Sequence, residues 1–164
     1  MKKLIALLLG ALMLCAMASC DNGNEENTGF RPFVVGGVTV TLDAEAEPII
    51  ASLGAYVAFA ETGSCYGDDK DKVYQYTSYK IQTYSNEGKD YILSVEIFDD
   101  ADTSIATPEG ICIGDSAEDV LNKHGTPNVQ TEQQIVYFDY DNDAKLQILL
   151  RDGVVTNIQY LKYE

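Results

Sequence analysis

The sequence predicts an α+β fold built from two tandem repeats, each a short helix followed by a three-stranded antiparallel meander. Two observations predict this fold. Apolar residues spaced for one helical face and stopped by a glycine occur twice, once before Gly54 and once before Gly125. Each of these helices precedes a tyrosine-bearing strand, a second strand, a turn and a third strand. We therefore expect the same element order twice, with short helices covering one face of the sheet.

The first nineteen residues have the pattern of a secretory signal. Lys2 and Lys3 precede an apolar run, Leu4 to Met17, which is too short to span a membrane as a mature helix. Small residues then lead to Cys20, as in a bacterial lipoprotein signal, which this pattern resembles. We expect residues 1–19 to be a signal peptide, and Cys20 to be lipidated and to anchor the chain on the outer face of the cytoplasmic membrane. A plain secreted protein and an uncleaved anchor are the alternatives.

The composition of the next segment and the overall charge restrict the partners. Residues 20–32 are mostly polar and are expected to form a flexible tether. The formal net charge is −15, and removal of Lys2 and Lys3 with the signal makes it more negative. Such a charge repels nucleic acid and anionic headgroups. We therefore expect no nucleic-acid partner, membrane contact through the lipid anchor only, and an unknown protein or peptide as partner.

The first repeat is predicted over residues 33–105. A strand is expected from Phe33 to Leu42, because this stretch is rich in β-branched residues. A helix with four apolar positions on one face follows and ends at Gly54. Residues 55–69 are interpreted as an insertion. The predicted meander has strands Asp71–Thr77, one opening at Lys80, and Tyr91–Phe98, with a turn at 86–88.

The second repeat is predicted over residues 106–164. The stretch that begins at Pro108 is expected to form a short strand and then a helix whose cap is at Asp115, with Glu118 reaching back. Pro127 forbids continuation of that helix. The meander is expected from strands Gln134–Asp141, one opening at Lys145, and Val154–Leu161. A hairpin turn is expected at 151–153, which contains the Asp-Gly signal.

Several sequence motifs resemble those of a known protein family. The motifs are Gly110-Ile111-x-Ile113-Gly114-Asp115-Ser116, Val120-Leu121, Gly125-x-Pro127, Ser64-Cys65, Tyr74-x-Tyr76 and Gly88-Lys89-Asp90-Tyr91. The pattern resembles uncharacterised lipoproteins of Gram-positive gut bacteria. Its element order is similar to the β-lactamase-inhibitor-protein architecture and to small outer-membrane assembly lipoproteins of the BamE and SmpA type. By that resemblance, the open sheet face is expected to bind a partner protein.

The sequence offers little catalytic chemistry. His124 is the only histidine and lies on the apolar face of its helix, so we interpret it as structural. The run Asp139–Asp143 lacks the glycine and the distal acid of an EF-hand and is interpreted as a turn. We expect no catalytic residue, no bound metal and no cofactor, and we do not expect an enzyme. Cys65 and Cys112 could form a disulfide in an exported protein, or could remain two buried thiols.

The tyrosines suggest an interaction role. The chain has 11 tyrosines and no tryptophan. Tyr74, Tyr76, Tyr84 and Tyr140 fall in or beside the predicted meanders, where they could bind a partner on the open sheet face. Ordinary β-propensity on half-buried strands would also explain them. The sequence therefore supports a surface interaction module, with a structural or assembly component of the envelope as the alternative.

Overall fold

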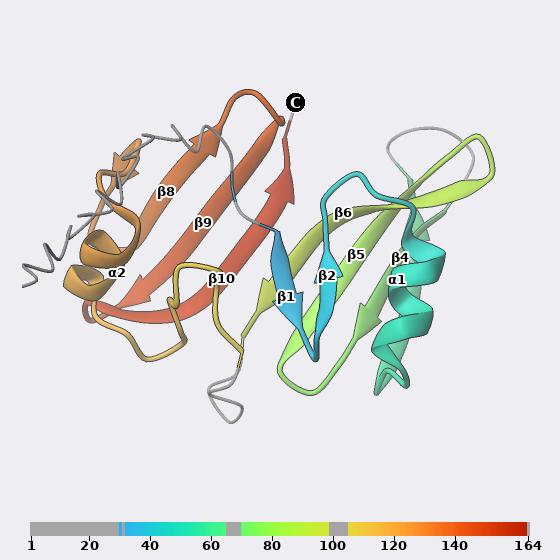
Figure 1. The fold of residues 1–164 in the computed structure, drawn as a ribbon, viewed down its shortest axis with the longest axis horizontal. Coiled ribbons are helices and arrows are strands. Elements are labelled where there is room, and N and C mark those ends of the chain that lie inside the picture. Colours follow the sequence, from blue (N-terminus) through green and yellow to red (C-terminus); the bar gives the residue numbers. More distant parts are fainter. Residues whose placement is uncertain (1–29, 31, 65–69, 99–104, 164) are drawn as a thin grey trace, which may run out of the picture.

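Antiparallel strands dominate the fold. The structure is a computed structural model that describes residues 30, 32–64, 70–98 and 105–163, of which strand takes up 51% and helix 13%. Eight strands form one sheet in the order β3-β4-β5-β6-β10-β9-β8-β7, and β1 and β2 form a separate hairpin (Figure 1). The strands are β1 (Phe33–Val35), β2 (Val38–Val40), β3 (Ala58–Gly63), β4 (Lys70–Gln75), β5 (Tyr79–Asn86), β6 (Lys89–Ile97), β7 (Val129–Gln130), β8 (Gln134–Asp139), β9 (Ala144–Arg151) and β10 (Val154–Lys162); the helices are α1 (Ala46–Leu53) and α2 (Ala117–His124).

The predicted fold class, an α+β arrangement of two helix-plus-meander repeats, is wrong. The strands after α1 and those after α2 belong to one continuous sheet, because β6 pairs with β10 from Ile97↔Ile158 to Ser94↔Leu161. The helices have only eight residues each. Apolar periodicity shows which residues of a strand share a face, but it does not show which edges pair. The backbone pairing of β6 with β10 thus makes the protein mostly β.

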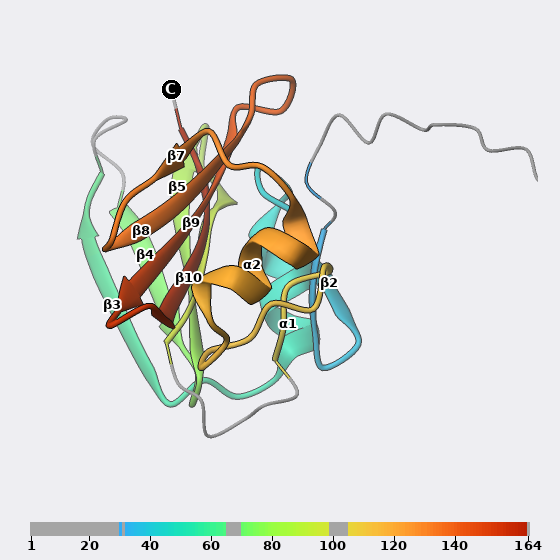
Figure 2. The same ribbon diagram turned by 90° about the vertical axis from the view of Figure 1, so that its left-hand side faces the viewer.

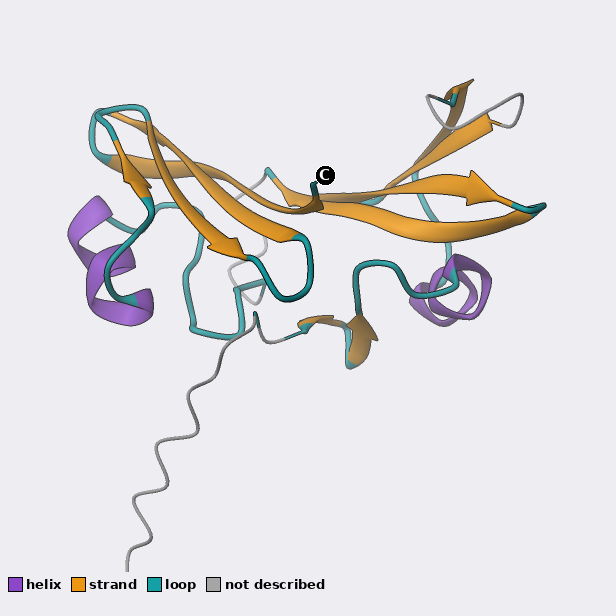
Figure 3. Ribbon diagram, turned by 90° about the horizontal axis from the view of Figure 1, so that it is seen from above, coloured by secondary structure: helices purple, strands orange, loops and turns teal. Residues whose placement is uncertain are grey.

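A broken second layer covers one face of the sheet. The helices and the β1–β2 hairpin lie on the same side of it (Figure 3). Gly36 and Gly37 have φ angles of 58° and 79° and turn the chain back, so the single strand predicted over 33–42 is a hairpin instead. Phe33 and Val40 are each 2% exposed and join the core. The hairpin therefore takes part in covering the sheet, a role that the prediction gave to helices alone.

Two other segments also differ from their predicted form. Residues 55–69, predicted as an insertion, contain β3, which pairs with β4 at the edge of the sheet. The short strand predicted before Asp115 is not formed; residues 108–109 and 113–114 are in turns, and Ile111 is buried. Ile111 is held by Thr107, whose backbone N–H donates to the Ile111 carbonyl and whose side-chain oxygen accepts the Ile111 N–H. This loop is part of the same covering layer.

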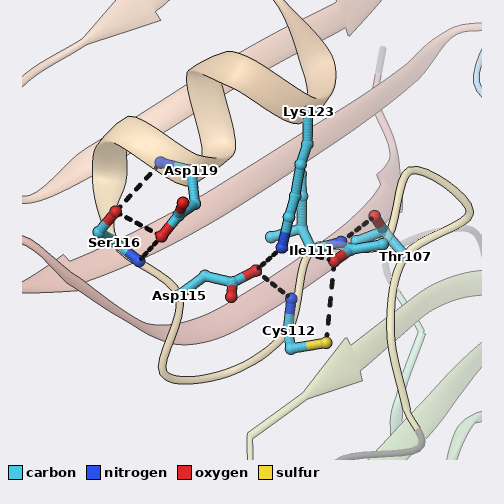
Figure 4. A network of polar contacts seen from close by, with 8 residues as sticks. Thr107, Ile111, Cys112, Asp115, Ser116, Asp119 and Lys123 are labelled. Carbon is cyan, nitrogen blue, oxygen red and sulfur yellow. Dashed lines mark hydrogen bonds and ion pairs between the residues drawn. The ribbon is translucent and has the colours of Figure 1, made fainter.

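The α2 cap is displaced by one residue from its predicted position. Ser116, not Asp115, is the N-cap, and Asp119 rather than Glu118 closes the capping box with it (Figure 4). Asp115 instead accepts the Cys112 N–H at 2.8 Å and forms an ion pair with Lys123 at 2.6 Å. The sequence pattern allows either Asp115 or Ser116 to be the N-cap, so the loop that enters the helix decides which of them caps it.

The hairpin turns follow the prediction. In the turn between β9 and β10, Asp152 and Gly153 have φ angles of 54° and 76°, and Glu87 and Gly88 repeat this between β5 and β6. Such paired positive angles match the twist of the flanking strands. The turns set the register that buries alternate residues of β5, β6, β9 and β10. The fully buried members of this set include Ile81, Ile92, Ile97, Leu146, Ile148 and Ile158.

Candidate functional site

One face of the eight-stranded sheet points away from the helices and the β1–β2 hairpin (Figure 3). We call it the uncovered face. Strand register aligns its side chains in two rows that cross five strands, β5, β6, β10, β9 and β8. The first row is Gln82, Ser94, Leu161, Lys145 and Phe138; the second is Lys80, Glu96, Gln159, Gln147 and Val136.

Most side chains of these rows are half-buried, although they are polar. Several are held by hydrogen bonds or ion pairs. The Lys80 Nζ lies 2.7 Å from a Glu96 oxygen, and the Asn157 Nδ2 donates to Glu96 at 2.9 Å. On the other half of the sheet, the Gln147 Nε2 donates to Gln134 at 2.8 Å. These contacts hold the polar groups in place without covering them, as in a preorganised binding surface.

A small pocket opens on this face between its two halves, the strands up to β6 on one side and those from β10 onward on the other. Its volume is about 210 Å³, and its lining combines leucine side chains with amide, hydroxyl and charged groups. The lining residues are Gln82, Leu93, Ser94, Glu96, Gln159, Leu161 and Lys162. The pocket thus lies where β6 meets β10, at the junction that joins the two parts of the sheet.

Aromatic side chains flank the rows. Tyr140, with 68% of its surface exposed, stacks on Phe138 at 5.6 Å, and Phe138 also meets Tyr163 at 5.2 Å. On the other half, Tyr84 follows Gln82 by two residues on β5, so it shares the uncovered face. Tyr84 stacks on Tyr91 at 5.6 Å. Aromatic rings around polar groups are typical of protein interfaces.

An electrostatic cluster fixes the Tyr84 end of the face. The Tyr84 hydroxyl donates to Asp43, and Lys162 forms an ion pair with the same carboxylate at 2.8 Å. The Lys162 Nζ also lies 5.6 Å from the centre of the Tyr84 ring. The hydrogen bond from Lys162 lowers the pKa of Asp43, and that from Tyr84 adds to the effect. Burial, followed by the bond to Asp43, raises the pKa of Tyr84, so its hydroxyl remains a donor.

The four tyrosines predicted for partner binding are not brought together. Tyr84 and Tyr140 belong to the uncovered face, at its two ends. Tyr74 pairs with Ile81, whose side chain is fully buried on the helix side, so Tyr74 lies on that side as well. Tyr76 is 5% exposed and stacks on Tyr79 at 4.6 Å. Tyr74 and Tyr76 are therefore absent from the open face that the prediction assigned to them.

The other candidates from the sequence, His124 and the run Asp139–Asp143, make contacts within the fold. The His124 ring packs against Tyr137 at 4.1 Å and near Phe30 at 6.0 Å. Residues 140–143 form a turn, as predicted, and the Asp139 carboxylate accepts N–H groups from Asp141, Asn142 and Phe30. Within the described ranges, no group of three or more potential ligands is arranged to hold a metal ion.

The cysteine predictions fall partly beyond the described residues. Cys20 and Cys65 lie outside them, so lipidation and the Cys65–Cys112 disulfide stay predictions. The Cys112 sulfur is 3.8 Å from the Gly110 carbonyl oxygen. In the part of the chain that the structure describes, neither helix has the length and apolar character needed to cross a membrane.

Sequence reasoning missed several members of the uncovered face. Gln82, Leu161 and Phe138 were not singled out, although each alternates with buried residues along its strand. That period-two pattern could have identified them. It could not have separated Tyr74 from Tyr84, because only the position of the helices and the hairpin shows which face is covered.

The arrangement defines a class by fold: a mostly antiparallel β protein with one covered and one uncovered sheet face. Comparison with known proteins adds little beyond that. The structure is similar to a cysteine-rich secretory protein from Staphylococcus aureus subsp. aureus Mu50, with a TM-score of 0.52 and 13% identity, over 82% of this chain and 46% of that chain. This chain therefore spans less than half of that protein, and the likeness concerns the fold alone. No family model and no curated protein matches the chain.

Proposed function

We propose that the chain is a non-catalytic protein-interaction module that binds a protein partner on the uncovered face of its sheet. The observation that carries the proposal is the pair of half-buried polar rows that stay accessible while the helices and the hairpin lie on the other side. Side chains such as Gln82 and Gln159 are held in fixed rows by the strand register, and aromatic clusters flank them. This composition supports a protein surface as ligand more than a small apolar molecule.

The site of the anchor is consistent with this use. We propose that the mature chain is exported and held at the cell surface by a lipid on Cys20, as the signal predicts. The Phe30 N–H donates to Asp139 at 2.8 Å, and its ring packs beside Tyr160, a buried residue of the covered side. Phe30 therefore lies on the covered side of the sheet.

A crosslinking pull-down from envelopes of cells that produce the protein tests the proposal. The test variant carries Gln82→Arg and Gln159→Arg, which place bulk and positive charge in the middle of the face without altering the buried core. The matched control carries Val34→Arg, at a site on β1 that is 50% exposed on the covered side. We expect a specific protein to be captured by the native chain and the control and lost with the test variant. The same proteins captured by all three would refute the proposal.

A further inference from the structure

Strand β3 is the outermost strand at one end of the sheet (Figure 2). It pairs with β4 through six consecutive residue pairs, from Ala58↔Gln75 to Gly63↔Lys70. All six of its residues are exposed. A strand paired on one side only directs the alternate N–H and C=O groups of its other edge outward, where they can accept a further strand.

This edge carries one charged residue, Glu61, but it is not short and has no lysine, proline or bulge. Natural edge strands are commonly very short, or carry lysine, proline or a bulge. The opposite edge strand, β7, is protected in this way because it has only two residues, Val129–Gln130. Strand β3 has six residues without lysine or proline, and its pairing with β4 keeps one register throughout. The contrast between the two edges marks β3 as the one that is suited to pairing.

Aromatic side chains lie beside the β3 edge on the covered side of the sheet. Phe59 and Tyr56 are each 44% exposed. Together with Tyr74 they form a cluster with ring centroids 5.2 to 5.8 Å apart. Tyr56 and Tyr74 also line a groove of about 510 Å³ against Ile50 and Ala51 of α1. An apolar side chain of an added strand would find a contact surface on these rings.

Charge indicates what kind of strand would pair there. Glu61 follows Phe59 by two residues, so the two side chains share a face. The Glu61 side chain is 39% exposed although its carboxylate forms an ion pair with Lys70 at 2.9 Å and Lys72 is its cross-strand neighbour on β4. The adjoining groove is lined by three acids, Glu45, Glu47 and Asp90, and by two lysines, Lys72 and Lys89, so its acids outnumber its cations. A second copy of the chain would bring another net charge of −15 to this edge and be repelled. A basic partner segment would instead be attracted to this edge.

We propose that β3 accepts an extended segment of another protein as an added strand. The segment carries an apolar side chain that packs on the Tyr56–Phe59–Tyr74 cluster and a basic side chain, two residues away, that faces Glu61. Its backbone hydrogen-bonds to the free edge of β3, and the two side chains select the sequence. This surface lies at the end of the sheet and does not depend on the uncovered face.

The probe is a blocked peptide, Ser-Thr-Leu-Thr-Arg-Thr-Ser, with binding to the full chain followed by fluorescence anisotropy. We expect Phe59→Ala to weaken binding about tenfold or more and Glu61→Lys to weaken it about fivefold, because each removes one of the two side-chain contacts. The Val34→Arg control and the Gln82→Arg, Gln159→Arg variant should bind like the native chain. Circular dichroism verifies that each variant is folded.

Methylation of the peptide backbone tests strand addition directly. Only alternate N–H groups of an added strand point to its partner. We expect N-methylation of one alternate set to abolish binding and of the other set to leave it within about twofold. Equal effects of both sets, or no loss with Phe59→Ala, would overturn the proposal, as would no binding of the native chain at millimolar peptide. A concentration-dependent dimer lost in the Phe59→Ala and Glu61→Lys variants would show a second copy to be the occupant and would also overturn it.

Discussion

The Lys162 Nζ lies 2.8 Å from the Asp43 Oδ2, which joins the end of β10 to the segment that enters α1. The two residues are 119 positions apart in the chain. Asp43 also donates its backbone N–H to the Ile92 carbonyl of β6. Beyond Ser94, β6 no longer pairs with β10 and is bonded instead to the segment that enters α1. The ion pair lies at this change of partner.

Loss of this ion pair should cost little stability, in a pH-dependent way. We expect Lys162→Met to lower the free energy of unfolding at neutral pH by about 0.5 to 1 kcal/mol, because both side chains are partly exposed. Lys162 lowers the pKa of Asp43 from its ordinary 3.8, so the contribution is present above that value and is lost as pH falls through the lowered pKa. Urea unfolding of the two proteins between neutral pH and about pH 3 measures this. A difference that stays constant over this range would contradict it.

The cap of α2 distinguishes the observed from the predicted pair. We expect Ser116→Ala to lower the free energy of unfolding by about 1 kcal/mol, because its side chain accepts the Asp119 N–H at 3.1 Å. Glu118→Ala, the control, should change it by less than about 0.5 kcal/mol, since Glu118 is exposed and outside the capping box. Urea denaturation of both variants decides the matter. Equal losses would place the cap elsewhere.

The junction of β6 and β10 should couple the two parts of the sheet. Ile158 pairs with Ile97, and both side chains are fully buried. We expect Ile158→Ala to cost about 2 to 5 kcal/mol and to leave a single unfolding transition. Val154→Ala, at a position 41% exposed at the start of β10, serves as the control and should cost far less. Transitions followed by circular dichroism and by tyrosine fluorescence should coincide, and two separate transitions would count against one continuous sheet.

Alkaline titration should reveal late-ionising tyrosines. Burial raises the pKa of Tyr137 to about 12 and that of Tyr79 to about 12. Both side chains remain protonated in the folded state at a pH where they would ionise in an unfolded chain. Their contribution to the free energy of unfolding is therefore fully present below about pH 10 and is lost between about pH 10 and 12. The Tyr137 hydroxyl donates to the Gly125 carbonyl at 3.0 Å. Phenolate absorbance of Tyr137→Phe should lack one late step, whereas Tyr140→Phe should keep it.

Local elements could be predicted from the sequence because they depend on neighbouring residues. The eight-residue helices end at Gly54 and Gly125 as predicted, since apolar spacing and a glycine stop act over a few positions. The turn at Asp152–Gly153 follows for the same reason. The cap at Ser116 was missed because Asp115 is an equally good acceptor, and only the loop that enters the helix decides between them.

Longer-range features were decided by the tertiary structure. The fold class was mispredicted because nothing in the sequences of β6 and β10 specifies that their edges pair, and the hairpin at Gly36–Gly37 took a place that was assigned to helices. The same limit applies to the site. Tyr74 and Tyr84 both lie in strands of the sheet, but α1 and the hairpin cover only one of its faces. The sequence by itself determined which side chains alternate along each strand, whereas the packing of distant segments decided which alternation meets solvent, because a strand has no intrinsic inside or outside until another layer covers it.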